Sequence, residues 1–288
     1  MDYSDDLYTT EIIELYFKGK NNYHPAEIAE HIKKDENITN IDEYWKKYYN
    51  NLPLSVIRLF NYPYNVQGSK EWLSDSGIVT SATVASIIDE NIHQTSDDCF
   101  LLQTNQIPPI YVTDAMRSGI IQEPHTAQKA ANRLNEKFFL IGSIKWDKNK
   151  NISVSCDRIS SSGYNVELKT PYYDRVYEDE NIDFLLENKI YYYHQVQLQM
   201  LVTGLKKTWF VRYGCAPNKN HCSKPLFDKE ILSCILVPFD EQWWPRYEKK
   251  INQFIDRVLE YRKNNPDWNK RKWTVEESYE YSLKNRIY

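Results

Sequence analysis

The sequence predicts an α/β fold, with a central mixed β-sheet flanked by helices and an N-terminal helical extension. Apolar residues recur at three- and four-residue steps over residues 113–138, 190–205 and 242–262, which is the spacing of amphipathic helices. Short runs rich in strand-forming residues lie between and after these helices: FFLIGSIKW, ISVSC, YNVELKT, TWFVRYG and EILSCILVPF. A helix, then strands, then a helix and more strands is typical of a mixed sheet covered by helices.

The first 65 residues are expected to form a helical extension. TTEIIELYF, PAEIAEHIKK and IDEYWKKYY each place apolar residues at helical steps, and Pro53 and Pro63 mark the loops that close this section. The pattern over residues 72–88 again predicts helix, with a break at Gly77. We therefore expect residues 1–65 to be the extension and residues 66–288 to be the main domain.

Composition excludes several classes of protein. No apolar run approaches the roughly 18 residues that a transmembrane helix requires. The N-terminus, MDYSDDLYTTE, is acidic and lacks the apolar stretch of a secretory signal. An intracellular protein that does not enter the membrane is therefore expected. The formal net charge of −4 gives no global sign of nucleic-acid binding, but a local groove can bind phosphates while the rest of the surface is acidic.

The five cysteines lack the spacing of a disulfide framework, so free intracellular thiols are the simplest interpretation. Cys215 and Cys222, with His221 between them, raise the alternative of a zinc enzyme. No second pair of ligands follows at a suitable spacing, which argues against this alternative.

The segment NISVSCDRISSSGYNVELKTP carries the most informative pattern. Glu167 and Lys169 alternate with Val166 and Leu168, so a strand turns the acid and the amine to one face. Asp157 ends an earlier strand, and the short SSSG turn allows a hairpin that brings it beside Glu167. Two neighbouring carboxylates repel each other unless a cation shares them, and hard oxygen ligands suit Mg²⁺ or Mn²⁺. This trio suits metal-assisted phosphodiester hydrolysis, although a Glu-x-Lys pair on a strand is also common on solvated faces.

Two helices add polar residues to this pattern. Glu123 falls between Ile120 and Ala127 on an otherwise apolar face, where a carboxylate is costly to bury without a partner or an ion. An acidic residue near a helix start is the alternative interpretation. On the second long helix, Tyr192, Gln195 and Gln199 form a polar stripe, which is either a solvent face or a surface that holds a glutamine against the attacking water or the scissile phosphate.

At this point the sequence resembles the phage lambda exonuclease and YqaJ-type viral recombinase branch of the PD-(D/E)XK nucleases. Four blocks carry the resemblance, in order: GIVTSATV (77–84), RSGIIQEPHTA (117–127), SCDRISSSGYNVELKTP (155–171) and YYHQVQLQMLVTG (192–204). The intervals between the acids, the lysine and the glutamine also agree with those of that family.

The resemblance implies a role for each matching residue. Asp157, Glu167 and the backbone carbonyl of Leu168 are the expected metal ligands, and Lys169 positions or activates the attacking water. Glu123 completes the metal site in that family, often through water. Gln195 matches the glutamine beside the active site. The resemblance further implies two Mg²⁺ or Mn²⁺ ions.

Four residues are predicted to bind substrate. Thr80 and Ser81 lie near an expected helix start, where backbone amides favour anions, and the resemblance adds Arg117 and Tyr192. The sequence departs from the family in its first block, because Asp75 stands where an arginine usually binds a terminal 5′ phosphate. This departure leaves endonuclease, RNase or altered end preference open.

The predicted function is a divalent-metal-dependent exonuclease that digests linear double-stranded DNA from 5′ ends in viral or mobile-element recombination, repair or replication. The resemblance implies a single-strand annealing protein as partner, a homo-oligomer, and a location in the cytoplasm or nucleus of a host cell. The alternative is an inactive nucleic-acid-binding or scaffold protein that keeps the fold.

Overall fold

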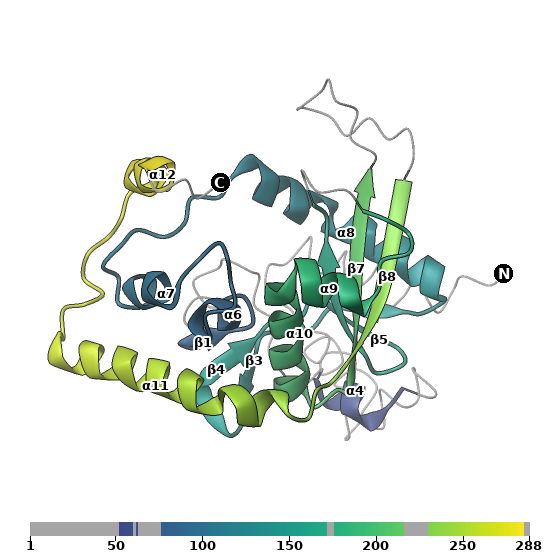
Figure 1. The fold of residues 1–288 in the computed structure, drawn as a ribbon, viewed down its shortest axis with the longest axis horizontal. Helices are drawn as coiled ribbons and strands as arrows, with labels where there is room; N and C mark the ends of the chain where they lie inside the picture. The colour runs from purple at the N-terminus through teal and green to yellow at the C-terminus, as the bar shows by residue number, and fades with distance from the viewer. Residues whose placement is uncertain (1–51, 60–61, 63–75, 172–175, 216–229, 285–288) are drawn as a thin grey trace, which may run out of the picture.

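A computed structural model describes residues 52–59, 62, 76–171, 176–215 and 230–284, and these contain two β-sheets (Figure 1). The three-stranded sheet has the spatial order β1 (Val79–Thr80), β4 (Asn149–Val154), β3 (Ile144–Trp146). The five-stranded sheet has the order β2 (Phe138–Phe139), β5 (Arg158–Ser160), β6 (Asn165–Lys169), β7 (Lys207–Cys215), β8 (Glu230–Pro238). Each sheet has both parallel and antiparallel pairs, which confirms the predicted mixed α/β class.

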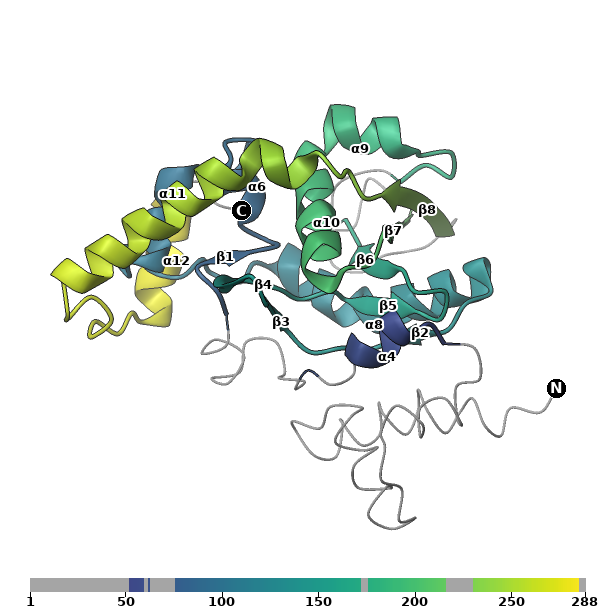
Figure 2. The ribbon, with the colours of Figure 1, turned by 90° about the horizontal axis from the view of Figure 1, so that it is seen from below.

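Helices cover both faces of the five-stranded sheet (Figure 2). On one face, α8 (Asp114–Leu134) packs Ala127 and Ala130 against Val166 and Leu168 of β6. On the other face, α9 (Ile182–Asn188) and α10 (Ile190–Thr203) pack against β7 and β8. The side chains of β6 therefore alternate between the two faces of the sheet as predicted. The apolar ones face α8, and Glu167 faces α10.

The largest apolar cluster lies around the three-stranded sheet and its helices. It joins α4 (Leu54–Leu59), α6 (Val84–Ile87) and α11 (Trp243–Asn264) to the buried side chains of β3 and β4. Helices α7 (Ser96–Gln103) and α12 (Val275–Lys284) complete this side of the molecule (Figure 1). The cluster packs against α6, β4 and α10, the elements that surround the cavity described below.

The β5–β6 hairpin is the predicted connection next to the acidic residues. Gly163 has a φ of +83° and its amide bonds the carbonyl of Ser160 at 3.0 Å, so the turn adopts a conformation that favours glycine. Arg158 pairs with Val166 across the hairpin. Asp157, the residue before β5, consequently lies beside the end of β6.

Residues 76–88 differ from the prediction, because most of this stretch is not helical. Val79 and Thr80 form β1, parallel to β4, and only Val84–Ile87 is helix. A side chain at Gly77 would put its Cβ 2.5 Å from the carbonyl oxygen of Asn151, so the close docking of this segment on β4 requires glycine. Residues 72–75 of the predicted helix lie outside the described residues.

Helix α8 also differs from the prediction, because the first half of its expected apolar face is exposed to solvent. The predicted helix runs from Asp114 to Leu134 without a break at Pro124, but Met116 and Ile120 are 44% and 61% exposed. Among the described side chains of this helix, the fully buried ones begin at Thr126. Glu123 thus lies in the middle of a helix at the edge of the buried part, rather than on a buried apolar face or near a helix start.

The predicted boundary between residues 1–65 and 66–288 stays a prediction, since residues 1–51 lie outside the described part of the chain. Within the described residues, no helix combines the length and the apolar character that crossing a bilayer demands.

Candidate active site

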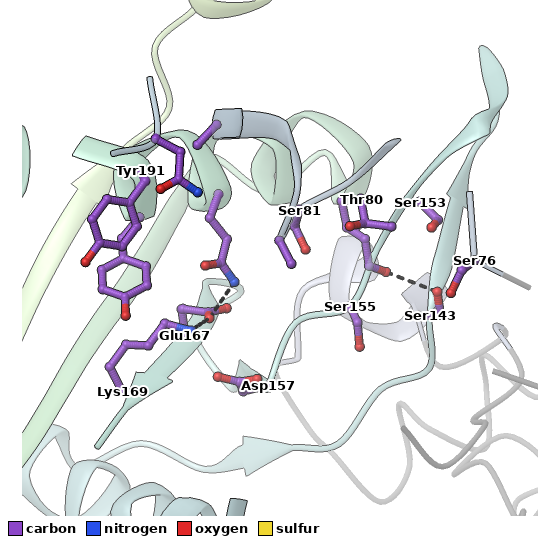
Figure 3. A pocket seen from close by; sticks show the side chains of 16 residues that line it. Ser76, Thr80, Ser81, Ser143, Ser153, Ser155, Asp157, Glu167, Lys169 and Tyr191 are labelled. Carbon is purple, nitrogen blue, oxygen red and sulfur yellow. Dashed lines mark hydrogen bonds and ion pairs between the residues drawn. The ribbon is translucent and has the colours of Figure 1, made fainter. Parts of the chain in front are cut away.

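A cavity of about 350 Å³ opens between α6, β4, β6 and the start of α10 (Figure 3). Asp157, Glu167 and Lys169 lie together in one part of it, and the hydroxyls of Ser76, Ser143 and Ser153 lie in another. The other lining residues are Thr80, Ser81, Ala82, Ala85, Asn91, Val154, Ser155, Tyr191, Tyr192 and Gln195. Residues from separate motifs of the sequence are thus gathered around one space.

Asp157 reaches this cavity from the loop between β4 and β5. Its Oδ2 accepts a hydrogen bond of 2.7 Å from the backbone amide of Leu168 on β6. Burial raises the pKa of Asp157 well above its usual value, and the negative charge of Glu167 raises it further. The shift reflects two carboxylates that repel each other in a space with little water.

Glu167 is 1% exposed and its carboxylate is surrounded by hydrogen-bond donors. Oε1 accepts from Lys169 Nζ and, at 2.6 Å, from Gln195 Nε2. Oε2 accepts from Gln199 Nε2 at 2.7 Å. One helix face of α10 therefore fixes the orientation of this carboxylate through two amides.

Lys169 lies between the acids and the aromatic wall of the cavity. Burial is the largest single effect and lowers the pKa of its amine, but the charge and hydrogen bond of Glu167, with the charges of Tyr192 and Asp157, together outweigh it, so the net pKa shift is upward and the side chain is an ammonium ion. Its Nζ lies 5.0 Å from the centroid of the Tyr192 ring. The ammonium is held on two sides and is available to a negatively charged ligand in the cavity.

Glu123 does not line the cavity. Its Oε1 instead accepts a hydrogen bond of 2.7 Å from Arg158 Nη1, and its side chain is 28% exposed. In the part of the chain that the structure describes, three or more His, Cys, Asp or Glu side chains do not converge on a point where they could hold a metal ion. Of the three acids that were expected at the metal site, two, Asp157 and Glu167, line the cavity.

Three of the four residues that were predicted to bind substrate lie at the cavity. Thr80, Ser81 and Tyr192 line the cavity as expected. The amide and the hydroxyl of Thr80 bond the hydroxyl of Thr83 at 3.0 and 3.1 Å, next to a helix of only four residues. The side chain of Arg117 lies outside the described residues, although its backbone belongs to α8.

The zinc alternative is not tested, because the side chain of Cys215 and residues His221 and Cys222 lie outside the described part of the structure. The described cysteines, Cys99, Cys156 and Cys234, are free thiols as predicted.

One residue of the site was noticed in the sequence without a role, and another was missed. Gln199 follows Gln195 by one helical turn and was part of the predicted polar stripe, but its bond to Glu167 was not predicted. Arg158 directly follows Asp157, and no local pattern reveals that it pairs with Glu123 on a distant helix.

The donor set of the cavity fits a hard divalent cation. Asp157 and Glu167 offer carboxylate oxygens, and oxygen ligands of this kind suit Mg²⁺ or Mn²⁺. Burial and then the charge of Glu167 raise the pKa of Asp157, and a cation between the two carboxylates would offset both effects because it stabilises the ionised form.

Comparisons with known proteins agree with this description. The family model of the YqaJ-like viral recombinase domain matches residues 71–206, a range that includes every residue that lines the cavity. No curated protein sequence matches the chain.

The chain is similar in fold to solved exonucleases. The alkaline exonuclease LHK-Exo from Laribacter hongkongensis has 19% identity and a TM-score of 0.52, over 70% of this chain and 99% of that one. LHK-Exo in complex with dAMP has 20% identity and the same coverage and TM-score. A phage related exonuclease from Haemophilus somnus 129PT has 11% identity over 64% of this chain and 92% of that one, with a TM-score of 0.44.

The family match and the shared fold confirm the resemblance that the four sequence blocks predicted. Residues 71–206 match the YqaJ-like viral recombinase domain family, and the described α/β core shares its fold with the alkaline exonuclease LHK-Exo.

Proposed function

We propose that this protein is a divalent-metal-dependent nuclease that hydrolyses phosphodiester bonds of DNA, acting on linear duplex as a 5′-to-3′ exonuclease. The observation that carries the proposal is the placement of Asp157, Glu167 and Lys169 in one cavity, on a fold shared with an alkaline exonuclease. Two carboxylates beside an amine give no advantage to simple binding of a polyanion, because the acids repel phosphate. They are the groups that a cation-assisted hydrolysis requires.

Each residue has a defined task in this proposal. Hydrolysis adds water across a P–O bond, leaving a phosphate on one product and a hydroxyl on the other. The ammonium of Lys169 donates to the phosphate oxygens and offsets the charge that develops on them. Gln195 and Gln199 keep the Glu167 carboxylate in a fixed orientation, and the amide of Leu168 does the same for Asp157.

Asp157, Glu167 and the carbonyl of Leu168 would hold Mg²⁺ or Mn²⁺. When bound there, the cation would polarise the phosphodiester and favour a nucleophilic water at neutral pH. The two carboxylates line the cavity, and their hydrogen bonds to the Leu168 amide and to the side chains of Gln195 and Gln199 hold them in place.

The polarity, the single-strand annealing partner, the homo-oligomer and the intracellular location rest on the likeness to YqaJ-type recombinases. Support for DNA as substrate comes from the solved relatives, one of which is a complex with dAMP. Tyr191 and Tyr192, whose ring centroids are 4.4 Å apart in the cavity wall, give a surface on which a base can stack.

Substitution of Lys169 tests the proposal. Lys169→Ala should lower the cleavage rate of labelled duplex by about 10²- to 10³-fold, the usual effect of losing one preorganised electrostatic donor. Binding of the same duplex, measured by fluorescence anisotropy without metal, should change much less.

Asp157→Asn tests the proposed metal ligand. This variant should have no cleavage activity and should bind Mn²⁺ more weakly than the wild type. Near-normal turnover in either variant would refute the assigned roles, and a wild-type protein that cuts neither DNA nor RNA would favour a scaffold that keeps the fold.

A further inference from the structure

Arg158 is a buried cation beside the proposed metal site. It is the first residue of β5, directly after Asp157, and its side chain is 7% exposed. Nη1 donates to Glu123 Oε1 at 2.7 Å and to the backbone carbonyl of Asp157 at 2.5 Å. This guanidinium therefore joins helix α8 to the loop that carries a proposed metal ligand.

The pair with Arg158 changes what Glu123 can do. A carboxylate that is engaged by a buried guanidinium is already neutralised and oriented. The negative charge of Glu123 still contributes to the upward pKa shift of Asp157, so the two acids are electrostatic neighbours. Glu123 nevertheless does not line the cavity, and its Oε1 is already engaged by Arg158.

The formal charges of this group decide how many cations it can take. Glu123, Asp157 and Glu167 carry three negative charges, and Arg158 and Lys169 offset two of them. One divalent ion leaves a single positive charge, which an incoming phosphodiester neutralises. A second divalent ion would bring the group to three positive charges in a buried space next to a guanidinium, where charges are weakly screened.

From these observations we infer that Arg158 takes the place of a second metal ion, so that the active site binds one divalent cation per chain. The inference rests on the proposed function and revises its expectation of two ions. Arg158 supplies a permanent positive charge next to Asp157, and Glu123 serves as the counter-ion of Arg158 rather than as a metal ligand. The hydrogen bond to the Asp157 carbonyl adds a positioning role, because it holds the loop that aims Asp157 at the cavity.

Metal stoichiometry tests this inference without any measurement of cleavage. Isothermal titration of the full-length protein with Mn²⁺, in the absence of DNA, should give one ion per chain at the site. Asp157→Asn should lose this ion, which identifies the site. Glu123→Gln should keep it with an affinity within about tenfold of the wild type, which is the range of an indirect effect.

Removal of the arginine charge gives the sharper result. Arg158→Gln should free Glu123 and produce a second Mn²⁺ site, and electron paramagnetic resonance should then detect two coupled ions roughly 4 Å apart. Arg158→Lys keeps the positive charge and should stay at one ion. The double variant Arg158→Gln with Glu123→Gln should return to one ion, because the acid that would hold the second is gone.

Several outcomes would overturn the inference. They are two Mn²⁺ ions per wild-type chain, loss of the ion in Glu123→Gln, or a single ion in a folded Arg158→Gln protein. If Arg158→Gln does not fold, as judged by circular dichroism, the wild-type and Glu123→Gln stoichiometries decide the matter. Failure of the proposed function would appear differently, as a wild-type protein that binds one ion but leaves DNA uncut.

Discussion

At the scale of single residues, the carboxylate of Glu167 is held in one orientation by three hydrogen-bond donors. Its two oxygens accept hydrogen bonds from an ammonium and two amides, and the side chain has almost no contact with solvent. A carboxylate held in this way cannot rotate to suit a ligand. Its supporting amides should therefore affect metal binding almost as strongly as the carboxylate itself.

Gln199 provides a test of this support. Gln199→Ala removes the donor to Glu167 Oε2, and we expect the affinity for Mn²⁺ to fall by about 10- to 100-fold. Gln197→Ala is a matched control, since Gln197 is equally buried on the same helix but bonds Pro238 and Asp240 instead. Titration calorimetry should find the affinity of the control close to that of the wild type. Equal losses in both variants would contradict the supporting role of Gln199.

Residues of the site were predictable where a local pattern determines them. Glu167 and Lys169 lie on one strand face because strands alternate, and Gln195 faces them because of the helical period. Glu123 was different, because its partner Arg158 comes from an element 35 residues away. Periodicity describes the face that a residue occupies and carries no information about the side chain that meets it there.

At the scale of elements, long periodic helices and apolar strands were predicted well, and short elements defined by their neighbours were not. Helices α8, α10 and α11 follow the expected ranges closely. Strand β1 has two residues and exists because Val79 and Thr80 pair with β4. Such a strand has no period of its own, so the segment from Gly77 was read as helix.

Replacing Gly77 or Gly119 by alanine should change the free energy of unfolding in opposite directions. Gly77→Ala would force a Cβ to 2.5 Å from the Asn151 carbonyl oxygen, so β1 must move from β4 and the free energy of unfolding should fall by about 1–3 kcal/mol. Gly119→Ala meets nothing within 4 Å on a helix and should raise it by about 0.5–1 kcal/mol. Urea denaturation of both variants measures the difference. A neutral Gly77→Ala would contradict the close docking of β1.

His194 couples α10 to α11 and should make stability depend on pH. Its Nδ1 accepts a hydrogen bond of 2.9 Å from Trp243, and burial, helped by the charge of Arg246, lowers its pKa from 6.5 to about 4. The folded state thus prefers the neutral ring. The resulting stability is complete above pH 6.5 and is lost as the pH falls toward 4.

Between pH 7 and pH 5 the loss from His194 should be roughly 2 kcal/mol. His194→Gln removes the titrating group while keeping an acceptor for Trp243, so the variant should lack this part of the pH dependence. Urea denaturation at both pH values compares the two proteins. An identical pH dependence in wild type and variant would refute the shift at His194.

At the scale of the whole molecule, the two sheets and their helices bring residues of three of the four sequence blocks around one cavity, while the block at 117–127 contributes no lining residue. The class of the fold followed from the order of helices and strands, but the division of the strands into two sheets did not, because pairing partners leave no local pattern. The net charge of −4 was equally uninformative about the site. In our proposal, the local group of three acids and two cations binds the metal and the phosphate, and the net charge of the chain does not describe this group.

The most direct test of the central claim is a cleavage assay on linear and covalently closed circular duplex DNA of the same sequence, with Mg²⁺ or with EDTA. We predict that the wild-type protein degrades the linear DNA with Mg²⁺, spares the circle, and does nothing in EDTA, while Lys169→Ala leaves both intact. Loss of the circle as well would identify an endonuclease and contradict the proposed exonuclease action. Degradation that persists in EDTA or in Lys169→Ala would contradict the metal-dependent site at Asp157 and Glu167.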